Sequence, residues 1–271
     1  MRRPFPLALI FVLCAVAAAQ APNATGPLAA PQAPTAAAAV EVVPAAAPRT
    51  TIPSDSNERS RPKNYADCRA RVAEANAHPE KHIDILFVGD SITEAWSGPA
   101  WGGYVHGAPV WEKVYAPRNA LNFGVGADRT QHVLYRLDTM DVKGLTPKVI
   151  VLMIGTNNNI DTAPDIAAGV HAVLVKLETM YPAAKIILVS ILPNGRATQL
   201  MADANALIRP FADERTVFYF DLAALLPPVG DSWLGLAPDK LHPTQVGYQI
   251  WADGMEPLLS RLLGGAAGAT Q

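Results

Sequence analysis

The chain has 271 residues, half of them hydrophobic, with 22 basic and 24 acidic side chains and two cysteines. This composition is typical of a soluble globular protein, and it excludes a collagen-like chain and a disulfide-rich miniprotein. Because the formal net charge is only −2, the chain lacks the basic excess of a nucleic-acid-binding protein. No nucleic-acid partner is therefore expected.

Residues 1–19 have the pattern of a secretory signal peptide. Arg2 and Arg3 precede an apolar run over 7–16, and the small residues 17–19 follow that run. The run is shorter than the roughly 20 residues that a membrane-spanning helix needs, so no integral membrane span is expected in the mature chain. We therefore expect a secreted or periplasmic protein that retains only Cys68 and forms no internal disulfide.

Residues 20–62 are expected to form a disordered linker. The stretch 21–53 is rich in alanine and proline, has no aromatic residue, and contains only Glu41 and Arg49 as charged residues. Such a composition cannot bury a hydrophobic core. The following residues 63–263 have the size of one domain, and 264–271 are expected to be a flexible tail.

Five short apolar runs in this domain predict strands that are buried on both faces, at 83–88, 120–123, 149–154, 185–191 and 217–220. Helical patterns lie between or after them, at 131–140, 164–180, 198–214 and 244–263. The last helix is expected to bend or break before Pro257. This alternation predicts an α/β fold with a five-stranded parallel sheet covered by helices on both sides.

Ligands of an open parallel sheet bind at the carboxyl ends of the strands, and polar segments follow the first, second, third and fifth predicted strands. They are Gly-Asp-Ser-Ile at 89–92, Asn-Phe-Gly-Val-Gly-Ala-Asp at 122–128, Gly-Thr-Asn-Asn at 155–158 and Asp-Lys-Leu-His-Pro at 239–243. Acyl transfer needs a nucleophile, a general base, a group that orients the base, and donors for the oxyanion. Ser91, His242 and Asp239 could fill the first three roles. Asn157 and the backbone of the 124–127 turn could supply the donors.

Spacing alone leaves a structural role open for each of these residues. Ser91 to Glu94 matches a helix capping box. Asp128 begins a second match, and there capping is the preferred interpretation. Asn157 is also a common kind of turn residue, and Asp239 could equally lie with His242 on a surface loop.

In their joint order, the four segments resemble the four blocks of the SGNH hydrolases, also called the GDSL lipase/esterase family. Residues 122–137 further resemble the catalytic subunits of platelet-activating-factor acetylhydrolase and their bacterial relatives. The resemblance implies a flavodoxin-like three-layer α/β/α fold. It also implies ester hydrolysis without a metal or other cofactor.

By the same resemblance, Ser91 is the nucleophile, His242 is the base, and Asp239 is the partner of that base. The backbone N–H groups of Ser91 and Ala127 and the side chain of Asn157 would form the oxyanion hole. The family normally has glycine at the position of Ala127. Alanine can serve there if its φ is negative, but a left-handed conformation would cost about 1–2 kcal/mol. Gly126 is the alternative donor.

An aromatic loop follows the Ser91 segment and carries Trp96, Trp101, Tyr104 and Trp111. Aromatic faces beside an esterase site can stack on a sugar or hold an acyl chain. We hypothesise that Trp96 or Trp101 lines the substrate entrance. Trp111 is expected to pack beneath the loop, together with Tyr115.

The sequence contains no metal-binding or nucleotide-binding motif. His78 and His82 are separated by Pro79, and no His-Glu-x-x-His occurs. We therefore expect an exported serine esterase without cofactors that removes short acyl groups, chiefly acetyl. The substrate would be a small-molecule, glycan or lipid ester. The alternatives are a polysaccharide O-acetylesterase and a catalytically impaired binding module with the same fold.

Overall fold

The structure is a computed structural model that describes residues 46–264. The expected signal peptide at 1–19, the first part of the expected linker and all but the first residue of the expected tail lie outside these residues. Between residues 46 and 264, no helix combines the length and the apolar character needed to cross a bilayer.

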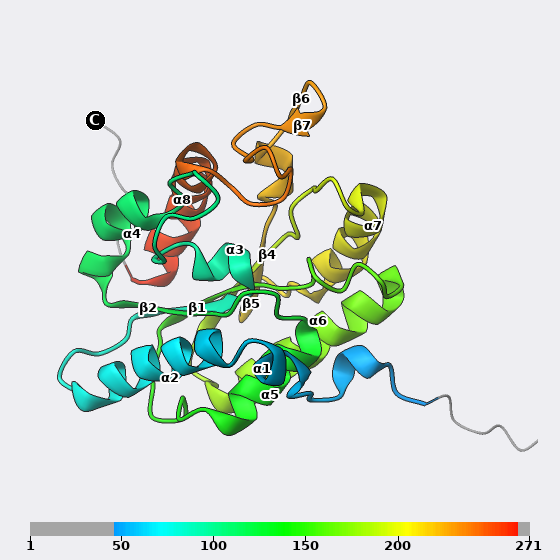
Figure 1. Cartoon of the computed structure of the whole chain (residues 1–271). Coiled ribbons are helices and arrows are strands. Elements are labelled where there is room, and N and C mark those ends of the chain that lie inside the picture. The colour runs from blue at the N-terminus through cyan, green and yellow to red at the C-terminus, as the bar shows by residue number, and fades with distance from the viewer. Residues whose placement is uncertain (1–45, 265–271) are drawn as a thin grey trace, which may run out of the picture. The chain divides into compact units, whose positions relative to one another are not determined.

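The centre of the domain is a parallel sheet of five strands in the order β2-β1-β3-β4-β5 (Figure 1). The strands are β1 Ile85–Gly89, β2 Ala120–Gly124, β3 Val149–Met153, β4 Lys185–Val189 and β5 Val217–Phe220. Each falls within or beside a predicted apolar run, and every residue of β1 and β3 is buried. This strand order is that of the flavodoxin-like folds, so the predicted fold class is confirmed.

Helices cover both faces of the sheet, which gives three layers (Figure 1). One face packs against α2 Pro62–Ala77, α5 Thr130–Thr139, α6 Ala163–Met180 and α7 Thr198–Ile208. The other packs against α3 Ser91–Glu94, α4 Ala108–Val114 and α8 Gln245–Leu262. Because side chains alternate along a strand, Leu86 and Val88 of β1 join the first core while Ile85 and Phe87 join the second.

The predicted helices form where apolar residues recur on one side. In α6, Thr162 accepts a hydrogen bond from the N–H of Asp165 and caps the helix. The helix then buries one apolar stripe: Ile166, Val170, Val173, Leu174 and Leu177. The predicted helix 198–214 is shorter than expected, because α7 ends at Ile208 and a 3₁₀ turn, Arg209–Phe211, follows.

The final helix is not broken at Pro257, although the sequence predicted that it would either bend or break there. The helix α8 continues from Gln245 to Leu262 with Pro257 inside it. A proline removes a backbone hydrogen bond and disfavours a helix interior. Here the buried side chains of Trp251, Met255 and Leu259 lie on both sides of the proline, and their packing keeps the helix continuous.

The prediction of a linker over 20–62 is wrong for its last part. Residues 49–51 form a 3₁₀ turn, and Ser56–Ser60 form α1. Thr50 donates a hydrogen bond from its hydroxyl to the carbonyl of Asp165, and its own carbonyl accepts one from Thr130. The folded domain therefore begins by Arg49. This segment is fixed by hydrogen bonds, which a judgement from hydrophobic composition does not detect.

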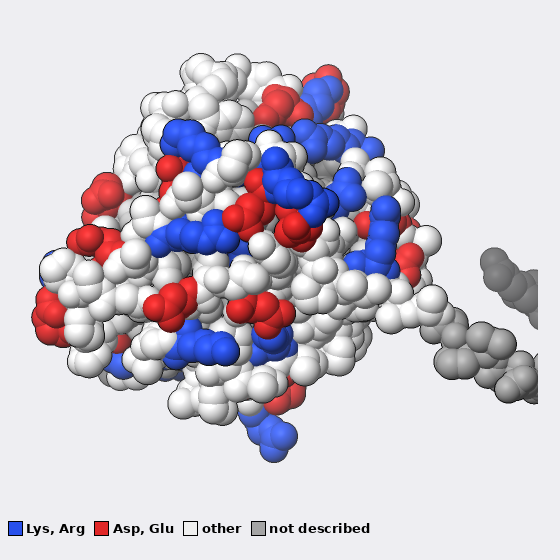
Figure 2. All heavy atoms as spheres, turned by 60° about the horizontal axis from the view of Figure 1, so that its bottom comes forward, with Lys and Arg blue, Asp and Glu red and all other residues white. Residues whose placement is uncertain are grey.

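Several basic side chains on the surface pair with acidic ones. Figure 2 shows lysine and arginine lying among aspartate and glutamate on one face of the molecule. Arg59 pairs with Asp55 within one helical turn, and Arg69 pairs with Glu58.

Two additional short strands, β6 Pro228–Val229 and β7 Ser232–Trp233, form a small antiparallel pair that the sequence did not predict.

Candidate active site

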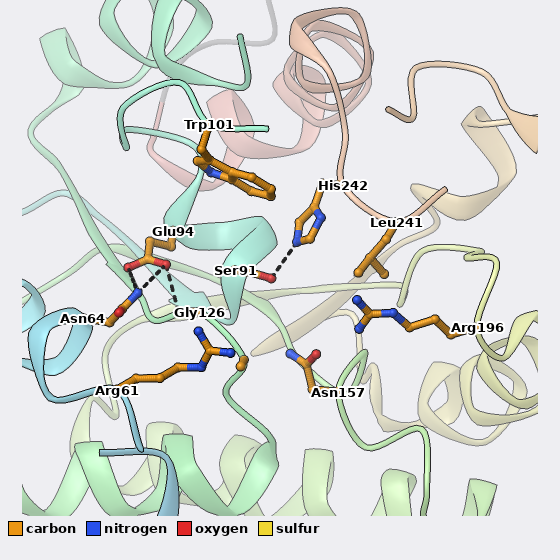
Figure 3. A pocket seen from close by; sticks show the side chains of 11 residues that line it. Arg61, Asn64, Ser91, Glu94, Trp101, Gly126, Asn157, Arg196, Leu241 and His242 are labelled. Atoms are coloured by element: carbon orange, nitrogen blue, oxygen red, sulfur yellow. Dashed lines mark hydrogen bonds between the residues drawn. The ribbon is translucent and has the colours of Figure 1, made fainter. Parts of the chain in front are cut away.

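Ser91 is the first residue of α3, directly after the sharp turn that ends β1. Gly89 makes this turn possible, because a Cβ atom there would lie 2.3 Å from the carbonyl oxygen of Met153. The side chain of Asp90 caps α3 by accepting a hydrogen bond from the N–H of Ile92 at 3.0 Å. The capping interpretation of Ser91 is therefore wrong, and its hydroxyl points instead to His242 (Figure 3).

Ser91, His242 and Asp239 form one hydrogen-bonded chain. The Ser91 Oγ lies 3.0 Å from His242 Nε2, and His242 Nδ1 lies 2.7 Å from Asp239 Oδ2. The other carboxylate oxygen, Asp239 Oδ1, accepts the backbone N–H groups of Leu241 and His242, each at 3.0 Å. The loop after β5 thus holds both the imidazole and its carboxylate against the end of β1.

The surroundings of the imidazole favour its neutral form. Burial lowers the pKa of His242, while the hydrogen bond and the charge of Asp239 oppose this effect. Burial of Asp239 would raise the pKa of its carboxyl, but the hydrogen bonds from the backbone and ring of His242 lower it overall. An ionised carboxylate only accepts hydrogen bonds, so Nδ1 carries the ring proton. His242 Nε2 is then free to accept the proton of the Ser91 hydroxyl.

Burial strongly raises the pKa of the neighbouring Asp90. This side chain is fully buried, and burial raises its pKa to about 7 against the opposing hydrogen bond from Ile92. Asp90 does not contact the imidazole. Its contribution is to fix the start of α3, and with it the position of Ser91.

Two of the expected oxyanion donors border the cavity beside Ser91. Asn157 uses one amide hydrogen to bond the carbonyl of Asp128 at 3.0 Å, which leaves the second hydrogen for a ligand. The N–H of Ala127 has no protein acceptor within the described chain. The N–H of Gly126 is already used, because it donates to Glu94 Oε2 at 2.9 Å. Gly126 is therefore the weaker candidate.

Ala127 has a left-handed backbone with a φ of 63°. Of the two conformations considered for alanine, the structure therefore has the costly left-handed one, which glycine adopts most easily. The strain stays in place because the next residue, Asp128, is firmly held.

Asp128 does not cap α5, and this interpretation from the sequence is wrong. Its carboxylate is fully buried and accepts hydrogen bonds from Arg136 at 2.6 Å, Tyr65 at 2.8 Å and Asn57 at 2.6 Å. The N–H of Arg129, at the start of α5, bonds instead to the ring of His132. A buried charge is tolerated only when it is paired and hydrogen-bonded, and these three partners satisfy Asp128.

Arg136 connects this buried carboxylate to the ends of two strands. Its guanidinium donates to the carbonyl of Phe123 at 2.7 Å and to that of Gly89 at 3.1 Å. Arg136 and Asp128 thus fix the loops that carry Ser91 and Ala127 relative to each other. The sequence did not indicate this role for Arg136, Tyr65 or Asn57. Tyr65 and Asn57 are more than 60 residues from Asp128 in the sequence, and the pairing of Arg136 with Asp128 has no sequence motif.

The two candidate tryptophans of the aromatic loop have different positions. Trp96 is fully buried, at 0% exposure, and packs between the rings of Tyr115 and Trp251. Its expected place at the substrate entrance is therefore wrong. Trp101 is 40% exposed, lines the cavity and meets the ring of His242 edge-on at 4.6 Å between centroids. Trp111 is buried under the loop as predicted.

A cavity of about 390 Å³ opens over the Ser91 hydroxyl. Figure 3 shows Trp101 and His242 on one side of it and Asn157 on the other. A volume of this order is typical of sites that bind a small-molecule ligand. Over residues 46–264, histidine, cysteine, aspartate and glutamate form no cluster of three that could bind a metal ion.

The fold and this site define a flavodoxin-like α/β protein with a serine, a histidine and an aspartate in hydrogen-bonded succession near the carboxyl edge of its sheet. Residues 87–250 match the model of the GDSL-like lipase/acylhydrolase family. The chain belongs to this family of hydrolases, which act on esters. The resemblance noted from the four sequence segments is thereby confirmed.

One curated relative is the human platelet-activating factor acetylhydrolase IB subunit alpha2, which is 37% identical over 129 residues. The match covers 48% of this chain and 52% of the relative, so the chain spans about half the length of this curated relative.

Solved structures of several esterases share the fold. A GDSL-like lipase from Bacteroides thetaiotaomicron has a TM-score of 0.57 at 19% identity, over 71% of this chain and 97% of its own. An acetylxylan esterase from Geobacillus stearothermophilus has a TM-score of 0.51 at 21% identity, over 69% of this chain and 97% of its own. At these identities, the likeness concerns the fold.

Proposed function

We propose that this protein hydrolyses esters of short acyl groups, above all acetyl, through an acyl-enzyme intermediate on Ser91. The observation that carries the proposal is the chain of hydrogen bonds from Ser91 through His242 to Asp239, at 3.0 and 2.7 Å. Such a chain places a nucleophile, its base and the group that orients the base in contact.

In the first half of the reaction, Ser91 Oγ attacks the ester carbonyl while its proton passes to His242 Nε2. The carbonyl oxygen becomes an oxyanion, which the N–H groups of Ser91 and Ala127 and the free amide hydrogen of Asn157 stabilise. Asp239 stabilises the imidazolium. His242 then gives the proton to the leaving alcohol, and the acyl group stays on Ser91.

In the second half, water enters the place of the alcohol and gives a proton to His242. The resulting hydroxide attacks the acyl-enzyme through a second oxyanion, and Ser91 leaves with the proton returned by His242. The carboxylic acid is released, and the site returns to its starting state.

A short acyl group is supported by the activities for which similar proteins are named. The relative described above is an acetylhydrolase, and one neighbour in fold is an acetylxylan esterase. The exposed Trp101 beside His242 supports a second candidate function, the removal of acetyl groups from a polysaccharide, because an aromatic face can stack on a sugar ring. Export through a signal peptide at 1–19 also remains part of the proposal.

The test is hydrolysis of 4-nitrophenyl acetate, butyrate and octanoate by the wild type and by Ser91→Ala. We expect turnover to fall with chain length and to vanish in Ser91→Ala, with an unchanged circular dichroism spectrum. Full turnover by folded Ser91→Ala would refute the mechanism, and a preference for octanoate would refute the acyl length. The second candidate function predicts faster acetate release from acetylated glycans than from acetylated phospholipids.

A further inference from the structure

Two arginines, Arg61 and Arg196, line the cavity over Ser91. Arg61 directly precedes α2, and Arg196 lies in the loop between β4 and α7. In Figure 3 their guanidinium groups extend from opposite sides toward Asn157. Within residues 46–264, neither guanidinium makes a hydrogen bond or an ion pair, whereas Arg59, Arg69 and Arg118 elsewhere pair with carboxylates.

The charge of these two arginines is not balanced inside the cavity. Of its lining residues in the described chain, Glu94 is the acidic one. Its carboxylate is engaged by the N–H of Gly126 at 2.9 Å and by the amide of Asn64 at 3.3 Å. The two positive charges of the guanidinium groups therefore exceed the one negative charge of Glu94. The N–H donors of both guanidinium groups are available to a ligand.

The position of Arg196 indicates which part of an ester it would meet. Arg196 and Leu241 border the cavity on the side of His242, where the proton is delivered to the departing alcohol. The positive charge of Arg196 is also close enough to contribute to the lowered pKa of His242. An anion bound here would belong to the alcohol part of the substrate and not to its short acyl group.

We infer that the natural ester carries an anionic group, a carboxylate or a phosphate, on its alcohol part, and that Arg196 and Arg61 bind this group. The inference rests on the proposed function and adds the substrate class. Arginine suits the role because its planar fork matches the oxygens of both anions. The ordered segment before α2, which brings Arg61 to the cavity, then contributes to substrate recognition.

The experiment compares three acetyl esters of similar shape: 4-acetoxybenzoate, 4-acetoxyphenyl phosphate and the neutral 4-acetoxybenzamide. The measured quantity is kcat/KM for each anionic ester divided by that for the neutral ester. We expect this ratio to fall at least about fivefold in Arg196→Gln or Arg61→Gln and further in the double variant. Arg196→Lys, which keeps the charge, should lose less of the ratio.

A matched control is Arg215→Gln, because Arg215 is exposed and does not line the cavity. It removes the same net charge and should leave the ratio unchanged. A ratio that is unaffected in both cavity variants, or that falls equally in Arg215→Gln, would overturn the inference. In the wild type, the anionic ester with the larger ratio shows whether the site prefers a carboxylate or a phosphate.

The two levels of the proposal fail differently. If the neutral ester is hydrolysed in a Ser91-dependent way but the cavity variants leave the ratio unchanged, only the anionic substrate is refuted. If none of the three esters is hydrolysed, or if Ser91→Ala hydrolyses them as well as the wild type, the proposed function itself is refuted.

Discussion

Replacing Ala127 with glycine tests whether the loop beside the nucleophile is held under backbone strain. The φ of 63° at Ala127 brings its Cβ close to the following carbonyl oxygen, a clash that glycine lacks. Ala127→Gly keeps the backbone N–H that the oxyanion would use. The substitution should therefore change the free energy of unfolding while leaving kcat on 4-nitrophenyl acetate within a few fold.

The magnitude follows from two opposing effects. Release of the left-handed strain raises the free energy of unfolding by about 1–2 kcal/mol. The greater freedom of glycine in the unfolded chain lowers it by about 0.4–1 kcal/mol. The net change lies between about 0 and 1.6 kcal/mol in favour of glycine. In a domain of roughly 200 residues, each 1 kcal/mol corresponds to about 2–4 °C in Tm.

The matched control is Ala202→Gly, at an exposed position inside α7 where the backbone is helical. It carries the same unfolded-state effect without any strain to release, and it should destabilise the protein by about 0.5–1 kcal/mol. Urea unfolding of both variants should place Ala127→Gly about 1–2 kcal/mol above Ala202→Gly. Equal destabilisation in the two would refute the strained conformation.

Three further predictions concern the site and its support. Asn157→Ala should lower kcat about 10²–10³-fold through the loss of one oxyanion donor, and a change below tenfold would exclude that role. Because His242 must be neutral and burial lowers its pKa, kcat/KM should rise with pH to a plateau, with a midpoint below about 6.5. A value of kcat/KM that does not change between pH 5 and 8 would contradict this. Trp96→Ala should lower the free energy of unfolding by about 3–5 kcal/mol, whereas Trp101→Ala should mainly raise KM. A stable Trp96→Ala variant with a raised KM, together with an unstable Trp101→Ala variant, would contradict these positions.

The strands and the main helices could be predicted from the sequence because burial leaves a local signal. Runs such as 149–154 are continuously apolar because the strand is covered on both faces. Ser91 and Asn157 could be found because residues that follow parallel strands meet at one edge. His242 and Asp239 needed the resemblance as well, since a short Asp-x-x-His spacing occurs in many loops.

Other features depend on contacts that no local pattern reveals. The sequence around Asp128 is typical of a helix cap, yet its carboxylate accepts hydrogen bonds from Tyr65 and Arg136. Tyr65 is distant in the sequence, and Arg136 is near but belongs to no motif with Asp128. Trp96 belongs to a glycine-containing loop but faces inward against α8. The segment around Thr50 has no run of large apolar residues and is ordered by hydrogen bonds to α5 and α6.

The central claim is that the Ser91 hydroxyl is activated by His242, and covalent labelling tests it most directly. The protein is treated with a fluorophosphonate, and the site of the adduct is found by peptide mass spectrometry. Our account predicts one adduct, on Ser91, that is absent in Ser91→Ala and strongly slowed in His242→Ala. An unlabelled Ser91 in the folded wild type, as in a binding module without activity, or labelling at the same rate without His242, would contradict it.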